Sequence, residues 1–129
     1  MFGKGRAADA NSTNHARGVE AESLAQEYLE GKGFSVIKTR YKTKFGEIDL
    51  IVKQDDVLCF VEVKARSNKA SALESVTFRS QKRIERSALF FLSEFPEYID
   101  FGMQFDVITI TPPFHVTHLE NAWEARSSY

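Results

Sequence analysis

Two carboxylates and a lysine interrupt the most apolar part of this sequence. The stretch GEIDLIVKQDDVLCFVEVKA, residues 46–65, consists of two apolar runs joined by a polar turn, which is typical of a β-hairpin. Asp49, Glu62 and Lys64 lie inside those runs, where an ionised side chain is costly to bury. Their position therefore calls for a chemical explanation.

The register of the hairpin follows from where its apolar residues fall. A turn symmetric about residues 55 and 56 makes one continuous apolar core face from three opposed pairs: Ile48 with Val63, Leu50 with Val61, and Val52 with Cys59. The opposite face then pairs Ile51 with Phe60, Asp49 with Glu62, and Glu47 with Lys64. A slip of one residue would mix the two faces, so this register is strongly favoured.

This register places Asp49 opposite Glu62, with Lys64 on the same face. Cross-strand Cβ atoms are roughly 4.5–5.5 Å apart, and like charges at that separation repel each other. A raised pKa on one acid, or a bound divalent cation, would relieve the repulsion. Two carboxylates suit a hard cation such as Mg²⁺, which activates water for attack on a phosphodiester, while a lysine neutralises developing charge. The alternative is a solvated face with a surface ion pair between Glu47 and Lys64.

The rest of the chain predicts the elements that hold these residues. Residues 18–31 and 76–95 repeat apolar residues at helical spacing, and residues 34–41, 104–110 and 114–119 have strand patterns. Residues 66–72 are expected to form a polar loop, and residues 120–125 a final helical turn. The order α, β, β, β, α, β, with a short strand appended, predicts an α/β fold in which helices flank a mixed central sheet.

Length and composition indicate one globular domain. Residues 18–129 are predicted to form that domain, and residues 1–17 a flexible polar leader. Cys59, the single cysteine, is expected to be a small core residue in a reducing compartment. No apolar stretch approaches the length of a membrane span and no signal peptide is recognisable, so we expect a cytoplasmic protein without a membrane partner.

Charge is unevenly distributed along the chain. The net charge is −1, which by itself argues against a strongly basic DNA-binding protein. Residues 64–86, however, hold seven basic residues against two acids, and residues 94–129 hold six acids against one base. One side of the molecule is therefore expected to be basic, unless these charges only form a solvated helix face.

The spacing of the charged residues resembles a known nuclease pattern. Asp49, followed after twelve residues by Glu62-Val63-Lys64, resembles the PD-(D/E)xK nuclease superfamily, whose restriction-endonuclease-like core has the order αβββαβ. More narrowly, the blocks ExxAxxYL, GEIDLI, FVEVKAR, QFDVITI and HLENAW resemble the bacterial YraN-like family, which is uncharacterised and similar to archaeal Holliday junction resolvases. The resemblance runs from about residue 18 to residue 123.

This resemblance implies roles for individual residues. Asp49 and Glu62 would be metal ligands, with the carbonyl of Val63 as a third, and Lys64 would be the catalytic lysine. Glu22 corresponds to a helix acid that completes the site in resolvase-like members, and Mg²⁺ or Mn²⁺ is the implied cofactor. The remaining implied or candidate residues are Glu20 as the alternative to Glu22, and Ser80, Gln81 or Lys82 as the residue of the second helix that faces the site.

The sequence leaves three interpretations of the function. The first is a metal-dependent endonuclease that hydrolyses phosphodiester bonds in DNA, including branched or recombination intermediates; the second is a catalytically silent nucleic-acid-binding module that retains the nuclease fold. A third reading makes the hairpin acids surface groups of a protein with an unrelated partner.

A resolvase-like enzyme is expected to form a homodimer, with exposed aromatic residues between 95 and 105 as the interface. The expected phosphate contacts are Arg66, Lys69, Arg79, Lys82, Arg83 and Arg86.

Overall fold

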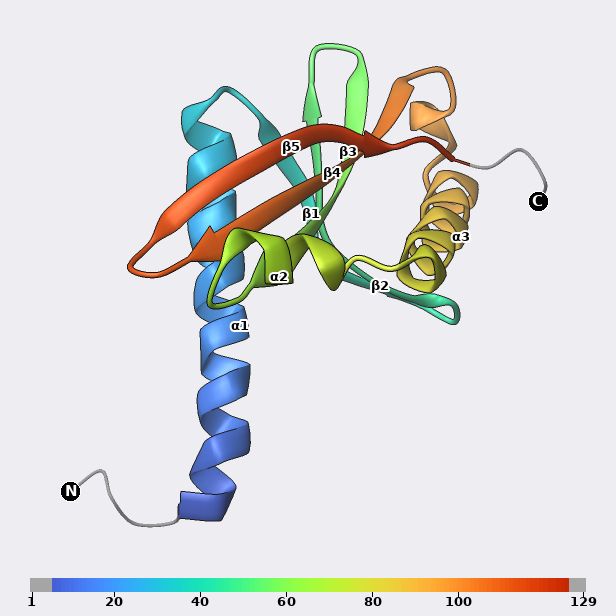
Figure 1. Cartoon of the computed structure of the whole chain (residues 1–129). Coiled ribbons are helices and arrows are strands. Elements are labelled where there is room, and N and C mark those ends of the chain that lie inside the picture. The colour runs from blue at the N-terminus through green and yellow to red at the C-terminus, as the bar shows by residue number, and fades with distance from the viewer. Residues whose placement is uncertain (1–5, 126–129) are drawn as a thin grey trace.

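The computed structural model describes the backbone of residues 6–125 and the side chains of residues 18–125. A five-stranded sheet in the order β1-β2-β3-β4-β5 forms the middle layer, and helices lie on both of its faces (Figure 1). The predicted α/β class and the αβββαβ order are confirmed. The elements are α1 (Arg6–Gly31), β1 (Ser35–Thr43), β2 (Gly46–Gln54), β3 (Val57–Ala65), α2 (Lys69–Glu74), α3 (Phe78–Glu94), a 3₁₀ turn η1 (Pro96–Tyr98), β4 (Gly102–Thr111) and β5 (His115–Trp123).

The sheet is mixed because one of its connections crosses over. β3 and β4 are parallel and are joined by the segment that contains α2 and α3, whereas the other neighbouring strands are antiparallel. Parallel strands need such a long connection, while the antiparallel pairs are joined by short turns. As a result, by the strand directions, the β1–β2 turn, the C-terminal end of β3 and the β4–β5 turn lie at the same end of the sheet.

Each face of the sheet carries its own apolar core. Ala21, Ala25 and Leu29 of α1 pack with residues of one face of the hairpin, such as Leu50 and Val61. The other face packs against α3 through a second cluster: Ile51, Phe60, Phe105, Trp123, Ile84, Ala88 and Phe91. Because strands buried on both faces cannot leave charged residues solvated, the acids of the hairpin must lie where this covering ends.

One residue of the predicted core face packs on the other side. Ile48 was expected beside Leu50 and Val52, but it belongs to the cluster of Ile51 and Ile84. The β2–β3 ladder has already stopped at Leu50, and Ile48 pairs with Tyr41 of β1, which packs against the same cluster.

Three segments differ from their sequence predictions. The first helix begins at residue 6 instead of residue 18, consistent with four alanines between residues 7 and 16 that favour helix. The predicted leader is therefore helical from residue 6, and residues 1–5 lie outside the described part. The expected loop 66–72 contains the start of α2, because the Asn68 side chain accepts a hydrogen bond from the Ser71 N–H at 2.8 Å.

The expected final helical turn is instead the end of β5. Trp123 pairs with Phe105 of β4, and the two rings stack with their centroids 5.2 Å apart. The indole N–H of Trp123 also donates to Glu85 Oε2 at 2.7 Å. These contacts hold the strand extended up to Trp123, whose ring is buried in the core.

The aromatic residues between 95 and 105 are mostly part of the core. Phe105 is buried, and Phe95, Tyr98 and Phe101 pack against the cluster around Phe91. The expectation of an exposed aromatic interface in this segment is therefore wrong, because the rings turn inward. None of the helices in the described part of the chain is long and apolar enough to cross a membrane.

Candidate functional site

Asp49 lies where β2 and β3 separate. The predicted hairpin register is confirmed from Gln54 and Val57 to Leu50 and Val61, and the ladder stops there. One residue further, the Asp49 carboxylate accepts a hydrogen bond from the backbone N–H of Val63 at 2.8 Å. The side chain thus continues the contact between the strands at the point where backbone pairing ends.

The charge state of Asp49 is strongly perturbed. Loss of hydration and, after it, the negative charge of Glu62 raise the pKa of the Asp49 carboxyl to about 8, and Glu22 contributes a smaller repulsion. The hydrogen bond from Val63 acts in the opposite direction without cancelling these effects. A carboxyl that holds its proton near neutral pH beside a second acid is a position that a cation can stabilise in place of the proton.

Glu62 and Lys64 form an ion pair within the same site. The Glu62 side chain is buried, with 5% of the residue exposed, and its Oε2 lies 3.2 Å from Lys64 Nζ. This burial contradicts the alternative of a solvated hairpin face. The surface pair between Glu47 and Lys64 is also wrong, because Lys64 pairs with Glu62.

Glu22 reaches the site from α1 but is engaged by an arginine. Arg40 Nε donates to Glu22 Oε1 at 2.8 Å. This hydrogen bond, with smaller contributions from Glu47 and Asp49, raises the pKa of Arg40. Arg40 adopts a positive φ of 50°, a conformation that costs energy in a residue other than glycine and that clusters at functional sites. The alternative acid, Glu20, lines a different cavity.

Sequence reasoning missed two neighbours of these acids. Arg40 lay unnoticed within a predicted strand, and nothing in the sequence marked it. Thr109 is the register partner of Lys64 across β3 and β4, and among the described residues its buried hydroxyl has no hydrogen-bond partner. Its signal was present, since Thr109 is a polar residue on the face of β4 that also carries the buried Phe105 and Val107.

The residues present fit a hard divalent cation in part. Asp49 and Glu62 supply carboxylate oxygens, the donors that Mg²⁺ and Mn²⁺ prefer, and their mutual repulsion favours a positive charge between them. Across residues 18–125, however, no three His, Cys, Asp or Glu side chains are grouped so that they could hold a metal. A cation here would rely on two carboxylates, with the Val63 carbonyl, water or substrate oxygens completing its shell.

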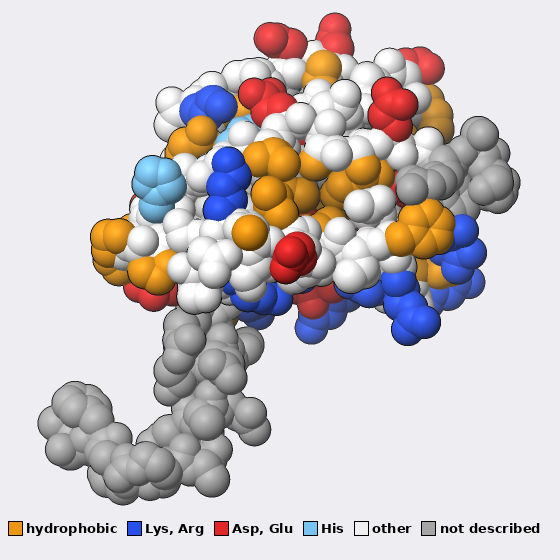
Figure 2. Space-filling view, viewed as in Figure 1, with side chains coloured by type: hydrophobic (Ala, Val, Ile, Leu, Met, Phe, Trp, Pro, Cys, Tyr) orange, Lys and Arg blue, Asp and Glu red, His pale blue; other side chains and the backbone are white. Residues whose placement is uncertain are grey.

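The six predicted phosphate contacts divide into two groups. Four of them line one groove of about 370 Å³ beside the N-terminal half of α3: Arg79, Lys82, Arg83 and Arg86. Arg66 instead lies in a cavity of about 450 Å³ between α1 and the β4–β5 turn, and Lys69 is exposed at the start of α2. Lys and Arg side chains gather at the lower right of Figure 2, over the N-terminal end of α3.

The structure narrows the choice among Ser80, Gln81 and Lys82 as the α3 residue that faces the acids. Ser80 is buried, and its hydroxyl donates to the Thr77 carbonyl at 2.8 Å, so it belongs to the cap of α3. Lys82 lies over the ring of Phe78 in the groove. Gln81 is half-buried and remains the candidate among the three.

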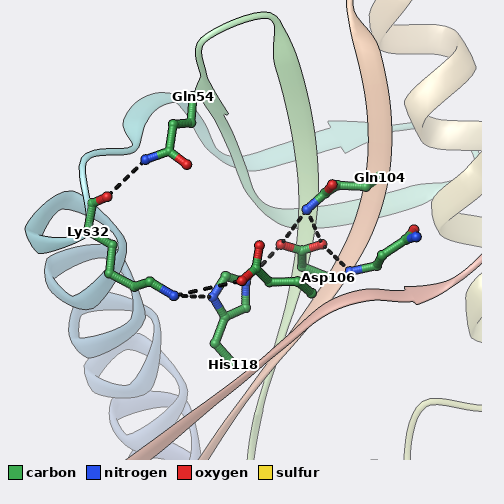
Figure 3. Close-up of polar contacts among 7 residues, drawn as sticks. Lys32, Gln54, Gln104, Asp106 and His118 are labelled. Carbon is green, nitrogen blue, oxygen red and sulfur yellow. Dashed lines mark hydrogen bonds and ion pairs between the residues drawn. The ribbon is translucent and has the colours of Figure 1, made fainter.

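A second polar cluster lies apart from these acids and is structural. The His118 side chain is 2% exposed, and its Nε2 lies 2.8 Å from Asp106 Oδ2 (Figure 3). Asp106 also accepts from the backbone N–H of Asn121 at 2.9 Å and from the Gln104 amide, at the register shift between β4 and β5. All four hydrogen-bonding groups thus hold the bulge of β5 against β4.

A protein-family model and similar proteins from several bacteria indicate the same family for this chain. The model of the uncharacterised protein family UPF0102 matches residues 21–110. A UPF0102 protein of Azorhizobium caulinodans is 41% identical over 110 residues, which is 85% of this chain and 84% of that protein. One of Rhodopseudomonas palustris is 43% identical over 108 residues (84% and 83%), and one of Mesorhizobium japonicum is 39% identical over 113 residues (88% and 90%). The matched region contains every residue of the candidate acidic site.

Proposed function

The chain belongs to the uncharacterised protein family UPF0102, and from this premise we propose that it is a metal-dependent endonuclease that hydrolyses phosphodiester bonds in DNA. The observation that carries the proposal is the group of Asp49, Glu62 and Lys64 at the point where β2 and β3 separate. Their resemblance to the PD-(D/E)xK pattern supports the same reaction.

Each residue has a role that follows from its position. Asp49 and Glu62 would hold Mg²⁺ or Mn²⁺, with the Val63 carbonyl as a further ligand. When bound, the cation polarises the phosphate and lowers the pKa of a water molecule. Lys64, held 3.2 Å from Glu62, places a positive charge where negative charge develops on the phosphate. Glu22 completes the site once it is released from Arg40, and the basic residues along α3 hold the phosphate backbone.

The substrate form is the finer part of the proposal. The similarity of YraN-like sequences to Holliday junction resolvases favours branched DNA or recombination intermediates. Symmetric cuts in two strands require two active sites, so a homodimer belongs to this proposal. Sedimentation that finds only monomer at high protein concentration would contradict that part without touching the chemistry.

Cleavage by matched variants tests the proposal. Wild type should cut at least one of single-stranded, duplex, flapped and four-way DNA when Mg²⁺ or Mn²⁺ is added, and EDTA should stop it. Asp49→Asn and Lys64→Ala should abolish cleavage while the protein stays folded. Lys53→Ala, at the other end of the hairpin, is the control for Lys64 and should cut like wild type. A clean preparation that cuts nothing in the panel refutes the endonuclease.

A catalytically silent nucleic-acid-binding module is the second candidate. The observation that favours it is the Glu22–Arg40 hydrogen bond, because it removes the acid that would complete the metal site. This candidate predicts salt-sensitive binding of nucleic acid that EDTA does not change and that Asp49→Asn leaves intact. Cleavage that depends on both the cation and Asp49 eliminates it.

A further inference from the structure

The groove beside α3 combines positive charge with exposed aromatic rings. It is formed by the β1–β2 turn and by residues of α3 spaced three or four apart, which lie on one side of a helix. The other side of α3 is buried against the sheet. The lining residues are Phe45, Phe78, Arg79, Lys82, Arg83 and Arg86, and no acidic side chain is among them in the described part of the chain.

The two phenylalanines are exposed to solvent although the core lies close by. Phe78 is 52% exposed and Phe45 is 37% exposed, whereas Phe91, on the sheet side of the same helix, is buried. A lysine lies over each ring, with Lys82 Nζ 5.5 Å from the Phe78 centroid and Lys44 Nζ 5.4 Å from the Phe45 centroid. Exposed rings within a basic surface are the pattern by which proteins stack the bases of single strands.

A glycine fixes one wall of the groove. Gly46 has a φ of 151°, and a Cβ built there would lie 2.5 Å from Cγ and Cδ of Arg83. The stem of Arg83 therefore crosses directly over the start of β2. This packing joins the β1–β2 turn to α3 and keeps Phe45 on the same groove as Phe78.

The groove is close to the acidic site along β2. Gly46 is three residues before Asp49, and a strand rises about 3.3 Å per residue, so the separation is about 10 Å. A stacked strand advances about 3.4 Å per nucleotide, so this separation corresponds to about three base steps. A strand held in the groove would therefore reach Asp49 and Lys64 within a few nucleotides.

We propose that this basic and aromatic groove binds unpaired nucleotides of a nucleic acid whose neighbouring phosphodiester lies at Asp49, Glu62 and Lys64. The inference deepens the proposed function, on which it rests, by naming the form of the substrate. The four positively charged side chains of the groove favour binding of a polyanion, and its two aromatic rings favour binding of planar groups. In a duplex the base faces are already stacked on one another, so only unpaired bases can use Phe45 and Phe78. An acidic peptide would satisfy the charges but not the rings.

Binding without metal separates this inference from the nuclease activity. Fluorescence anisotropy in EDTA measures the affinity of wild type for a labelled oligothymidylate and for a duplex of the same length. Wild type should bind the single strand more tightly. The double variant Phe45→Ala, Phe78→Ala should lose at least tenfold in single-strand affinity with little change for the duplex, and Phe78→Trp should retain wild-type binding. Phe114→Ala, at a phenylalanine 65% exposed outside this groove, is the matched control and should bind like wild type.

Each contrary result has one meaning. Equal losses for single strand and duplex, no loss in the double variant, or no binding of DNA by wild type would each overturn the inference. If polyglutamate displaces the oligothymidylate from wild type, and if the double variant no longer binds polyglutamate, the inference is overturned in favour of an acidic peptide. Far-UV circular dichroism checks that the variants are folded. Absence of cleavage by wild type leaves these binding results valid, so the two proposals can fail separately.

Discussion

Replacing Asp49 with asparagine should change how the stability of the protein depends on pH. The folded-state pKa of about 8 lies above the value of ~3.9 expected for an aspartate in the unfolded chain. Between about pH 5 and pH 8 the folded protein therefore holds a proton that the unfolded chain has released. Stability from this group is complete below the unfolded pKa and is lost as the pH rises through the folded pKa.

The magnitude follows from linkage. When a group is protonated only in the folded state, the free energy of unfolding falls by at most ~1.4 kcal/mol for each unit by which the pH rises. Partial exposure of the Asp49 carboxyl reduces that slope. Even a quarter of it, over three pH units, amounts to ~1 kcal/mol, which urea melts can resolve.

Urea unfolding of wild type and Asp49→Asn at about pH 5, 6, 7 and 8 measures this effect. The difference in the free energy of unfolding between the two proteins gives the contribution of Asp49 at each pH. The variant should become more stable than wild type as the pH rises. Asp56→Asn, at an exposed acid in the β2–β3 turn, is the control and should follow wild type. Mg²⁺ added at pH 8 should stabilise wild type and not Asp49→Asn. Parallel pH curves for wild type and Asp49→Asn would refute the raised pKa.

Three further changes test the framework that positions the site. Phe91→Ala empties a fully buried position in the α3 core and should cost ~3–5 kcal/mol in chemical unfolding. Asp106→Ala leaves His118 and the bulge of β5 without their acceptor and should cost ~2–4 kcal/mol, whereas Asp106→Asn should cost less; equal losses would contradict the assigned hydrogen bonds. Gly46→Ala should destabilise by ~1–3 kcal/mol and weaken single-strand binding, because it displaces Arg83; unchanged stability would contradict the close packing.

The sequence was informative where local rules determine structure. Alternation of apolar residues fixed the hairpin register from Leu50 to Gln54, because any slip would have exposed one face of a sheet buried on both sides. The same register brought Asp49 and Glu62 together at the end of the ladder. The helix order then followed from apolar spacing, which packing against the sheet enforces.

Contacts between distant segments were beyond sequence reasoning. Arg40 reaches Glu22 across 18 residues of sequence, and its positive φ has no composition signal. The groove of Phe45 and Phe78 joins a hairpin turn to a helix, so neither ring appeared exceptional in its own segment. The contact of His118 with Asp106 also had no sequence signal, because strand pairing alone makes the two residues neighbours.

Isothermal titration of wild type and Asp49→Asn with Mg²⁺ and Mn²⁺, with DNA cleavage assayed on the same samples, tests the central claim most directly. Wild type should bind one of the cations and cut DNA, and Asp49→Asn should do neither while remaining folded. Cation binding of equal strength in both proteins, or cleavage that survives in Asp49→Asn, would contradict the assignment of Asp49 and Glu62 as the metal site.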